Sequence, residues 1–354
     1  MNYIDEIQNN IAAGIPLSNV DYSGKSFDAV DLCGAIFISC QFTRSIFKGC
    51  DFKGASFMQC DHQEASFTDS LSMPVFIQCK MNGSKWSGDC TSATFSEGDL
   101  SNSLWSNCDI KTSNFSQCNL ESSRFLGCHF DTTSVTAARI GIISLTQCDF
   151  NNVTLMGFDF SKSAITECSF CQALLITCDF SGLDMSGVTL TKSTCNDSKF
   201  VGTKLTKGQL SETGFSDCTI ENADFSEAKL QKSLFINSRI DGSDFSKADL
   251  KNSNFQGAIL SKSDFSDSDM SQAWCKSMEA ADSNFSSVNL SYTNISYAAL
   301  NHCDFSSSQC KATNIHALTD NESNWKGVDQ AQLIKVDKNQ QQLDKQLKEY
   351  GVSA

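Results

Sequence analysis

Large apolar residues recur at every fifth position along most of this chain. From Phe95 to Ile315, almost every residue whose number is a multiple of five is Phe, Leu, Ile, Met or Val. Strands alternate with a period of two and amphipathic helices with a period of 3.6, so this spacing indicates a repeat architecture. A small residue stands two positions earlier, as Ala223 does before Phe225. Two inward residues around one outward residue, followed by a corner, predict one side of a square coil.

Four such sides close a coil of roughly twenty residues, so residues twenty apart are expected to stack in one column. One column would contain Phe225, Phe245, Phe265, Phe285 and Phe305. Neighbouring coils should be spaced like strands in a sheet, at about 4.8 Å. The pattern therefore predicts an all-β solenoid whose interior is filled by the large residues.

The segments "NADFS", "KADLK", "GSDFS" and "KSDFS" resemble the repeats of the pentapeptide-repeat family, whose consensus is A(D/N)LXX. The resemblance covers residues 20–325. It implies a right-handed quadrilateral β-helix, which at twenty residues per coil would have about fifteen coils, and we expect short capping helices at its N- and C-termini. It also implies a non-enzymatic scaffold that mediates protein–protein interaction through its outer faces.

The register of the repeat shifts twice, near residues 68–75 in "TDSLSMPVF" and near residues 87–94 in "SGDCTSATF". At each place the large residues lie nine apart instead of ten. A corner that lacks one residue and a loop that projects outward both remain open as explanations.

Both ends of the chain predict helices that flank the repeats. Residues 1–19 would form a capping helix and an entry turn, because Ile4, Ile7 and Ile11 lie on one helical face and Gly14 can end the helix. Residues 326–354 would form an amphipathic helix that caps the last coil or forms a homodimer. Its apolar stripe comprises Leu333, Val336, Leu343, Leu347 and Tyr350, with Gln340 between them.

The formal charge of −14 disfavours direct binding of nucleic acid, since phosphate contacts depend on Lys and Arg. Asp5 and Glu6 stand where a signal peptide would carry basic residues, and no run of apolar residues is long enough to span a membrane. We therefore expect a cytoplasmic protein, with export by a dedicated secretion system as the alternative.

No catalytic constellation is recognisable, so we expect no enzymatic activity, cofactor or metal. The His residues are His62, inward by its register, and His129, His302 and His316 on different sides of the coil. The chain has 18 Cys, many at the small inward position, as the column Cys108, Cys128, Cys148 and Cys168 illustrates. Buried Cys behaves as a small hydrophobic residue, so these are expected to be packing residues rather than disulfides or metal ligands.

One side of the predicted coil carries apolar residues at positions that should face water. Exposed apolar patches often mark contacts with other molecules. We therefore predict a binding strip for a protein partner, made of Met156, Leu174, Ile176, Leu234, Ile236 and Trp274.

Another surface is acidic, with aspartates at outward positions one coil apart. A rigid acidic solenoid is similar to the DNA-mimicking pentapeptide proteins of the quinolone-resistance type, which would imply a type II topoisomerase as the partner. The predicted acidic face comprises Asp224, Asp244, Asp264, Asp304, Asp249 and Asp269.

The entry segment "IDEIQNNIAAGIPLSNVDYSG" resembles the start of pentapeptide proteins that accompany type VI secretion clusters. This likeness implies an accessory protein of a secretion system or a secreted bacterial effector.

Overall fold

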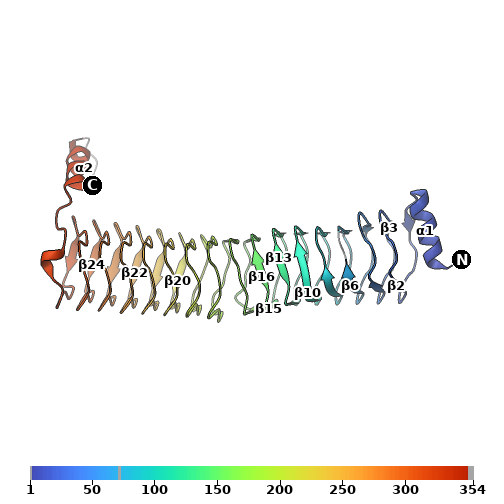
Figure 1. The fold of residues 1–354 in the computed structure, drawn as a ribbon, viewed down its shortest axis with the longest axis horizontal. Coiled ribbons are helices and arrows are strands. Elements are labelled where there is room, and N and C mark those ends of the chain that lie inside the picture. Colours follow the sequence, from blue (N-terminus) through green and yellow to red (C-terminus); the bar gives the residue numbers. More distant parts are fainter. Residues whose placement is uncertain (1, 71–72, 350–354) are drawn as a thin grey trace. The chain divides into compact units, whose positions relative to one another are not determined.

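The computed structural model describes residues 2–70 and 73–349, and the chain divides into two compact units, Met1–Asp179 and Phe180–Ala354. Each unit is a stack of short parallel strands connected by corners (Figure 1). The predicted fold class is confirmed, because the chain forms a parallel β-solenoid of about 15 turns with one N-terminal and one C-terminal helix. Residues 71 and 72, which belong to the first register shift, and Tyr350 lie outside the described residues.

The first unit has two large parallel sheets. The nine-stranded sheet contains, in order, β1 (Leu17–Ser18), β3 (Ile36–Ile38), β5 (Ser56–Met58), β7 (Val75–Ile77), β9 (Thr94–Ser96), β11 (Asn114–Ser116), β14 (Ser134–Thr136), β17 (Thr154–Met156) and β19 (Leu174–Ile176). The ten-stranded sheet contains β2 (Ser26–Asp28), β4 (Ile46–Lys48), β6 (Ser66–Ser70), β8 (Lys85–Asp89), β10 (Leu104–Lys111), β12 (Arg124–Leu126), β15 (Ser144–Thr146) and β18 (Ala164–Thr166), with β13 (His129–Asp131) and β16 (Asp149–Asn151) branching from β10.

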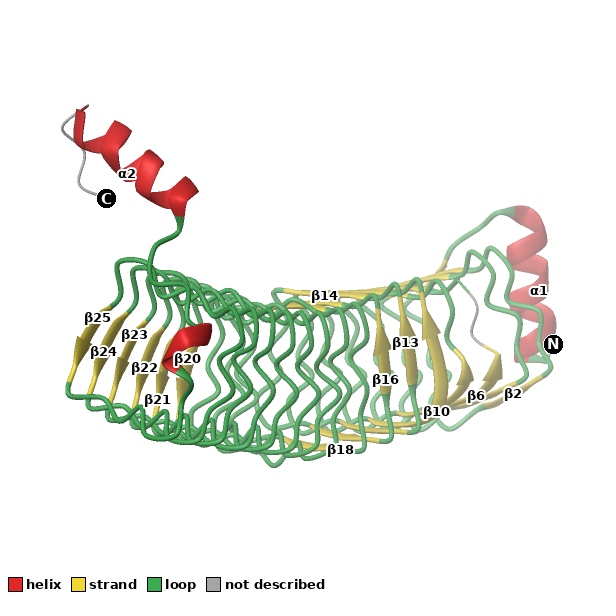
Figure 2. Ribbon diagram, turned by 60° about the vertical axis from the view of Figure 1, so that its left-hand side comes forward, coloured by secondary structure: helices red, strands yellow, loops and turns green. Residues whose placement is uncertain are grey.

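The second unit has one six-stranded sheet, whose strands lie side by side in Figure 2. These strands are β20 (Thr219–Glu221), β21 (Arg239–Asp241), β22 (Ile259–Ser261), β23 (Glu279–Ala281), β24 (Ala299–Asn301) and β25 (Thr319–Asn321). The other three sides of each coil are held by single β-bridges between residues twenty apart, such as Asp224 with Asp244, Lys229 with Asp249 and Asn254 with Trp274. Four sides per coil agree with the quadrilateral prediction.

The core consists of the columns that the five-residue period predicts. The rings of Phe225 and Phe245 stack with centroids 4.7 Å apart, and those of Phe245 and Phe265 stack at 4.8 Å. These side chains have no exposed surface, and Ala223 and Ser233 at the small position are buried as well. Aromatic pairs at this separation contribute more than their buried area alone.

Both register shifts fall in coils that are one residue shorter than the others. Phe67 pairs with Trp86 and Trp86 with Trp105, a step of nineteen residues each time. The corner is straightened there, so that β6 and β8 run for five residues. Gly88, with a φ of +93°, permits this, because a Cβ atom at Gly88 would lie 2.1 Å from the carbonyl oxygen of Asp69. An irregularity in β10 between Ser106 and Cys108 then restores the step of twenty residues, so that Cys108 pairs with Gly88.

Helix α1 (Tyr3–Ala13) covers the first coil. Asn2 caps its start by accepting a hydrogen bond from the backbone N–H of Ile4, and Gly14 ends it in the left-handed conformation. The ring of Tyr3 contacts Phe27 edge to face at 5.5 Å, and Ile7 is completely buried. An exposed end of the stack would offer unpaired backbone groups to another chain, so this cover has a protective role.

The C-terminal segment begins its helix later than the apolar stripe suggests. A short 3-10 helix (Gln330–Gln332) precedes α2 (Lys338–Glu349), so Leu333 and Val336 lie before α2. The reason is that Ile334 forms a β-bridge with Asn314 and extends the coil by another side. Asp337 then accepts a hydrogen bond from the backbone N–H of Asn339 at the start of α2.

A charge in the aromatic column should disrupt the solenoid. We expect Phe245→Asp to lower the free energy of unfolding by at least about 4 kcal/mol, since it removes a buried ring and buries a carboxylate without a partner. Guanidinium unfolding followed by circular dichroism measures the loss. The control Phe245→Leu, which keeps an apolar side chain, should cost about 1 kcal/mol. Equal losses in the two variants would contradict the stacked core.

Candidate interaction surfaces

The predicted apolar strip has members in both units, and each set is described by itself. In the first unit, β17 and β19 are neighbours in the nine-stranded sheet, with Met156 in register with Ile176 and Thr154 with Leu174. The side chain of Met156 is 51% exposed, whereas Leu174 and Ile176 are partly covered. The structure therefore brings these three residues together on one outer face.

In the second unit, Leu234, Asn254 and Trp274 are joined by consecutive β-bridges and lie on one side of three successive coils. Leu234 is 40% and Trp274 is 43% exposed, and Ile236 is half-buried beside Leu234. The indole Nε1–H of Trp274 donates a hydrogen bond to Oε1 of Gln256 at 3.1 Å, which holds the ring over the coil between. We call Leu234, Ile236 and Trp274 the second-unit patch.

A further row of outward apolar residues was missed from the sequence. Ile38, Met58 and Ile77 are in register on β3, β5 and β7, and Ile36 and Val75 accompany them on the same sheet. Ile36 is 36% exposed and the other four are half-buried. The signal was available, because these residues flank the inward Phe in "IFI", "SFM" and "VFI", where the repeat expects polar side chains.

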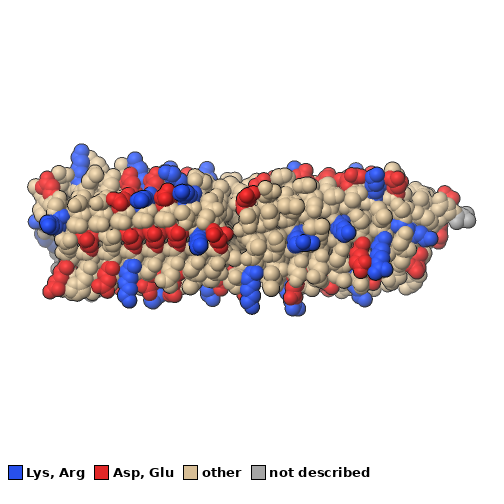
Figure 3. All heavy atoms as spheres, turned by 90° about the horizontal axis from the view of Figure 1, so that it is seen from below, with Lys and Arg blue, Asp and Glu red and all other residues tan. Residues whose placement is uncertain are grey.

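The aspartates of the predicted acidic face line one side of the second unit. Asp224, Asp244 and Asp264 are joined by consecutive β-bridges, and a row of acidic side chains is visible in Figure 3. The row is interrupted by Asn284, whose side-chain amide donates to Asp264 at 3.0 Å, and continues at Asp304. The backbones of Asp249 and Asp269 are joined by a β-bridge on a different side of the coil.

These carboxylates also stabilise the corners of the coil. Oδ1 of Asp244 accepts a hydrogen bond from the backbone N–H of Ser246 at 2.7 Å, and Asp264 accepts in the same way from Ser266 at 2.9 Å. Burial acts to raise the pKa of Asp224, but hydrogen bonds from Ser226 and Thr206 outweigh it and leave that pKa below its ordinary value. The acidic row therefore has a structural role whether or not a partner recognises it.

Asp344 of α2 is the centre of the contact between this helix and the wall of the coils. The hydroxyl of Tyr297 donates to Asp344 Oδ1 at 2.5 Å, and Nε2 of His316 lies 3.0 Å from Asp344 Oδ2. Gln340 donates to the hydroxyl of Ser296 at 3.3 Å. Leu343 remains 49% exposed and Leu347 is half-buried.

Sixteen of the 18 cysteines are buried in the coil as packing residues, whereas Cys33 and Cys171 are half-buried and Cys33 lies beside Asp31 and Asp51. All 18 have free thiols and most are buried. The thiol of Cys118 donates to the carbonyl oxygen of Phe95 in the preceding coil at 3.3 Å, and Cys178 donates to Leu155 at 3.5 Å. Burial raises the pKa of both thiols to about 11, which keeps them protonated and poorly reactive at neutral pH.

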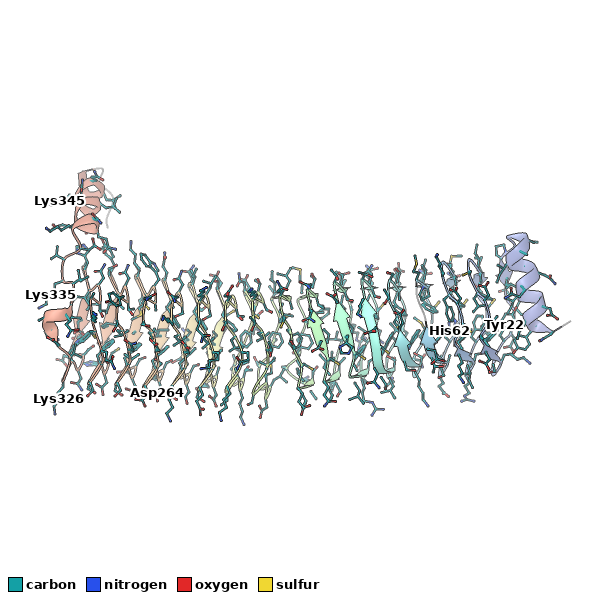
Figure 4. All side chains as sticks on the ribbon, viewed as in Figure 1. Tyr22, His62, Asp264, Lys326, Lys335 and Lys345 are labelled. Atoms are coloured by element: carbon teal, nitrogen blue, oxygen red, sulfur yellow. The ribbon has the colours of Figure 1, made fainter. Side chains whose placement is uncertain are left out.

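The four histidines have separate environments. His129 lies 3.1 Å from Asp149 and His302 lies 3.7 Å from Glu322, both on the surface. His62, labelled in Figure 4, is buried inside the coil and its ring stacks on Phe42 at 4.8 Å. Neither ring nitrogen of His62 has a hydrogen-bond partner among the described residues.

No helix in residues 2–70 and 73–349 is long and apolar enough to cross a membrane.

Family models for pentapeptide repeats match most of the sequence. The model of the pentapeptide repeat region matches residues 168–245, 188–265 and 208–285. The model of pentapeptide repeats in eight copies matches residues 17–70, 89–127 and 279–315. A search of curated protein sequences finds no match.

Solved structures of similar proteins share only low sequence identity. QnrB1, a plasmid-mediated fluoroquinolone resistance protein, is 16% identical over 57% of this chain and 98% of its own, with a TM-score of 0.23. HetL, which is involved in the regulation of heterocyst differentiation in Nostoc sp. strain PCC 7120, is 15% identical over 77% of this chain and 95% of its own, with a TM-score of 0.19. Likeness at this level carries no conclusion about a partner.

The buried His62 predicts a specific dependence of stability on pH. Burial lowers the pKa of His62 from 6.5 to about 3, so the unfolded chain binds a proton below about pH 6.5 while the folded chain does not. The contribution of His62 to the free energy of unfolding is therefore fully present above about pH 6.5 and is lost as the pH falls towards 3. Between pH 6.5 and 5 the natural chain should lose about 2 kcal/mol more than His62→Phe, at about 1.4 kcal/mol per pH unit.

Urea unfolding of both proteins at several pH values measures this difference, because the other titrating groups are common to both. The control Met156→Leu, at an exposed site without a titrating group, should follow the natural chain. Parallel pH profiles for the natural chain and His62→Phe would show that His62 is not buried in its neutral form.

Proposed function

Since the chain belongs to the pentapeptide-repeat family, we propose that it is a non-enzymatic scaffold that binds a protein partner through its outer faces. The observation that supports this proposal is the alignment of outward apolar residues across successive coils. The second-unit patch combines a Trp with two aliphatic residues, and Trp is enriched among the residues that dominate binding energy in interfaces. A stack of coils also holds such residues at fixed spacing, which reduces the entropy lost on binding.

Removing the second-unit patch should weaken binding of the partner without unfolding the scaffold. We expect Leu234→Ser, Ile236→Ser and Trp274→Ser together to raise the Kd by at least about thirty-fold, which corresponds to about 2 kcal/mol. The partner would be isolated from the native host with the natural chain, identified, and titrated against purified variants by calorimetry. Thermal unfolding checks that the variant remains folded.

The matched control is Ile259→Ser, which removes an apolar residue that is 41% exposed on the six-stranded sheet. This control should bind like the natural chain. A triple variant with unchanged affinity would exclude the second-unit patch as the interface.

The alternative function is mimicry of DNA towards a type II topoisomerase, and the row of Asp224, Asp244 and Asp264 favours it. Two features count against it. One carboxylate oxygen of each of these aspartates is occupied at a corner, and Lys204 continues the same row through its β-bridge to Asp224.

We therefore expect the natural chain to give no relief of quinolone inhibition in a DNA gyrase supercoiling assay, even in molar excess over the enzyme. The comparison variant carries Asp224→Asn, Asp244→Asn and Asp264→Asn, in which the side-chain oxygen that accepts at the corner is kept. Relief by the natural chain that this variant loses would establish mimicry instead.

A secretion-associated role is the third possibility, and it depends on the entry segment, residues 1–19. In the structure α1 of this segment packs on the first coil, with Tyr3 on Phe27 and Gln8 donating to the carbonyl oxygen of Asp31. Covering the end of the stack explains this segment without a secretion partner.

A further inference from the structure

The last coil of the second unit contains an edge strand. β25 pairs with β24 and is the terminal strand of the six-stranded sheet. An edge strand presents backbone N–H and C=O groups with which another chain can pair. The described hydrogen bonds between α2 and the coils go to Ser296, Tyr297 and His316, on the side of the coils and not on β25. The protection of this end must therefore come from the last coil itself.

Asp320 ends one apolar column with a charge. The inward position of the six-stranded sheet is apolar and buried in the five preceding coils, at Ile220, Ile240, Leu260, Ala280 and Leu300. Asp320 is in register with Leu300 and is exposed. One of its carboxylate oxygens accepts a hydrogen bond from the indole Nε1–H of Trp325 at 2.8 Å, and the other accepts from the backbone N–H of Ser323 at 3.3 Å. A further coil on β25 would bury this carboxylate against aliphatic side chains, which is strongly unfavourable.

A second column ends in a lysine. Ile334 forms a β-bridge with Asn314, so Lys335 follows Ile315 at the inward position of this side. Ile295, one coil earlier, is completely buried, whereas Lys335 is exposed and lies at the end of the coils (Figure 4). Another coil would remove water from its ammonium group without supplying a partner.

The other two columns end in different ways. The ring of Trp325 stacks on Phe305 with centroids 4.2 Å apart and covers the end of the aromatic column. The side that follows Cys310 is the 3-10 helix Gln330–Gln332, which lacks the extended backbone that pairs with a strand. Asp320, Lys335 and this 3-10 helix thus make three of the four sides unfit to receive a further coil.

We propose that Asp320 and Lys335 close the C-terminal end of the coils against pairing with a second copy of this chain. The end of another copy is the molecule that would otherwise fit, because its backbone groups and its apolar columns have the same spacing. Inward-pointing charges on an edge strand are a known means of preventing such pairing. This proposal does not depend on the partner-binding surfaces proposed above, which lie on the sides of the coils.

The test is the full chain with Asp320→Leu and Lys335→Leu together, which continues both columns with an apolar residue. We expect its mass, measured by light scattering after size-exclusion chromatography, to be twice that of the natural chain at high protein concentration. Because α1 covers the first coil, an open C-terminal end can pair only with another such end, so association should stop at pairs. Hydrogen exchange of the amides in Thr319–Asn321 should slow in the pair, since the outward backbone groups of β25 would then be bonded.

The matched control is Glu279→Leu with Lys326→Leu, which makes the same changes at exposed outward positions and should keep the mass of the natural chain. Asp344→Ala removes the partner of Tyr297 and His316, loosens α2 and should also keep that mass.

Asp320→Leu alone should pair more weakly than the double variant, and thermal unfolding checks that every variant is folded. Three results would overturn the proposal: an unchanged mass in both Asp320 variants, an equal rise in the matched control, or a doubled mass in Asp344→Ala.

Discussion

The hydrogen bond from the backbone of one coil to the backbone of the next is the interaction on which the whole molecule depends. The N–H of Phe225 donates to the carbonyl of Asp244 at 2.7 Å, and the N–H of Asp244 donates to the carbonyl of Ala223 at 2.9 Å. The same pair of bonds recurs on successive sides and coils and forms a ladder of hydrogen bonds between the coils. It fixes the vertical spacing near that of a β-sheet, and this spacing is what allows identical rings to stack without a gap.

The ladder also stabilises corners that are unfavourable by themselves. Lys232 has a φ of +59° and Asn237 has a φ of +56°, a region that side chains other than glycine seldom occupy. Each such residue costs of order 1 kcal/mol and persists only when its surroundings enforce it. The N–H of Lys232 donates to Lys251 and that of Asn237 to Gln256 in the next coil. The outward Asp or Asn that accepts from the next corner adds to this enforcement, which is why the acidic row cannot be attributed to function alone.

These constraints explain which features could be predicted. Inward residues obey a strict period, so the burial of His62 and the stacking of the Phe225 column follow from numbering alone. The extent of α1 also follows, because Asn2 and Gly14 are strong local end signals. The start of α2 does not, since Ile334 pairs with Asn314 across a coil and overrides the helical periodicity of Leu333 and Val336. Met156 and Ile176 of the predicted strip are in register on neighbouring strands, as their spacing of twenty requires. The row at Ile38, Met58 and Ile77 follows from the same rule, because these residues flank inward Phe residues nineteen or twenty positions apart.

Departures from the repeat are therefore of two kinds, those that change the backbone and those that change the inward side chain. At Gly88 the backbone absorbs a missing residue and the pairing between coils continues, so the departure alters one corner and leaves the wall intact. At Phe158 the pairing also continues, because the carbonyl oxygen of Phe158 accepts a hydrogen bond from the N–H of Asp179 at 2.8 Å, and the departure changes only the size of the buried inward side chain. The wall therefore accommodates both a missing residue and a larger inward side chain, because the hydrogen bonds between coils join backbone groups.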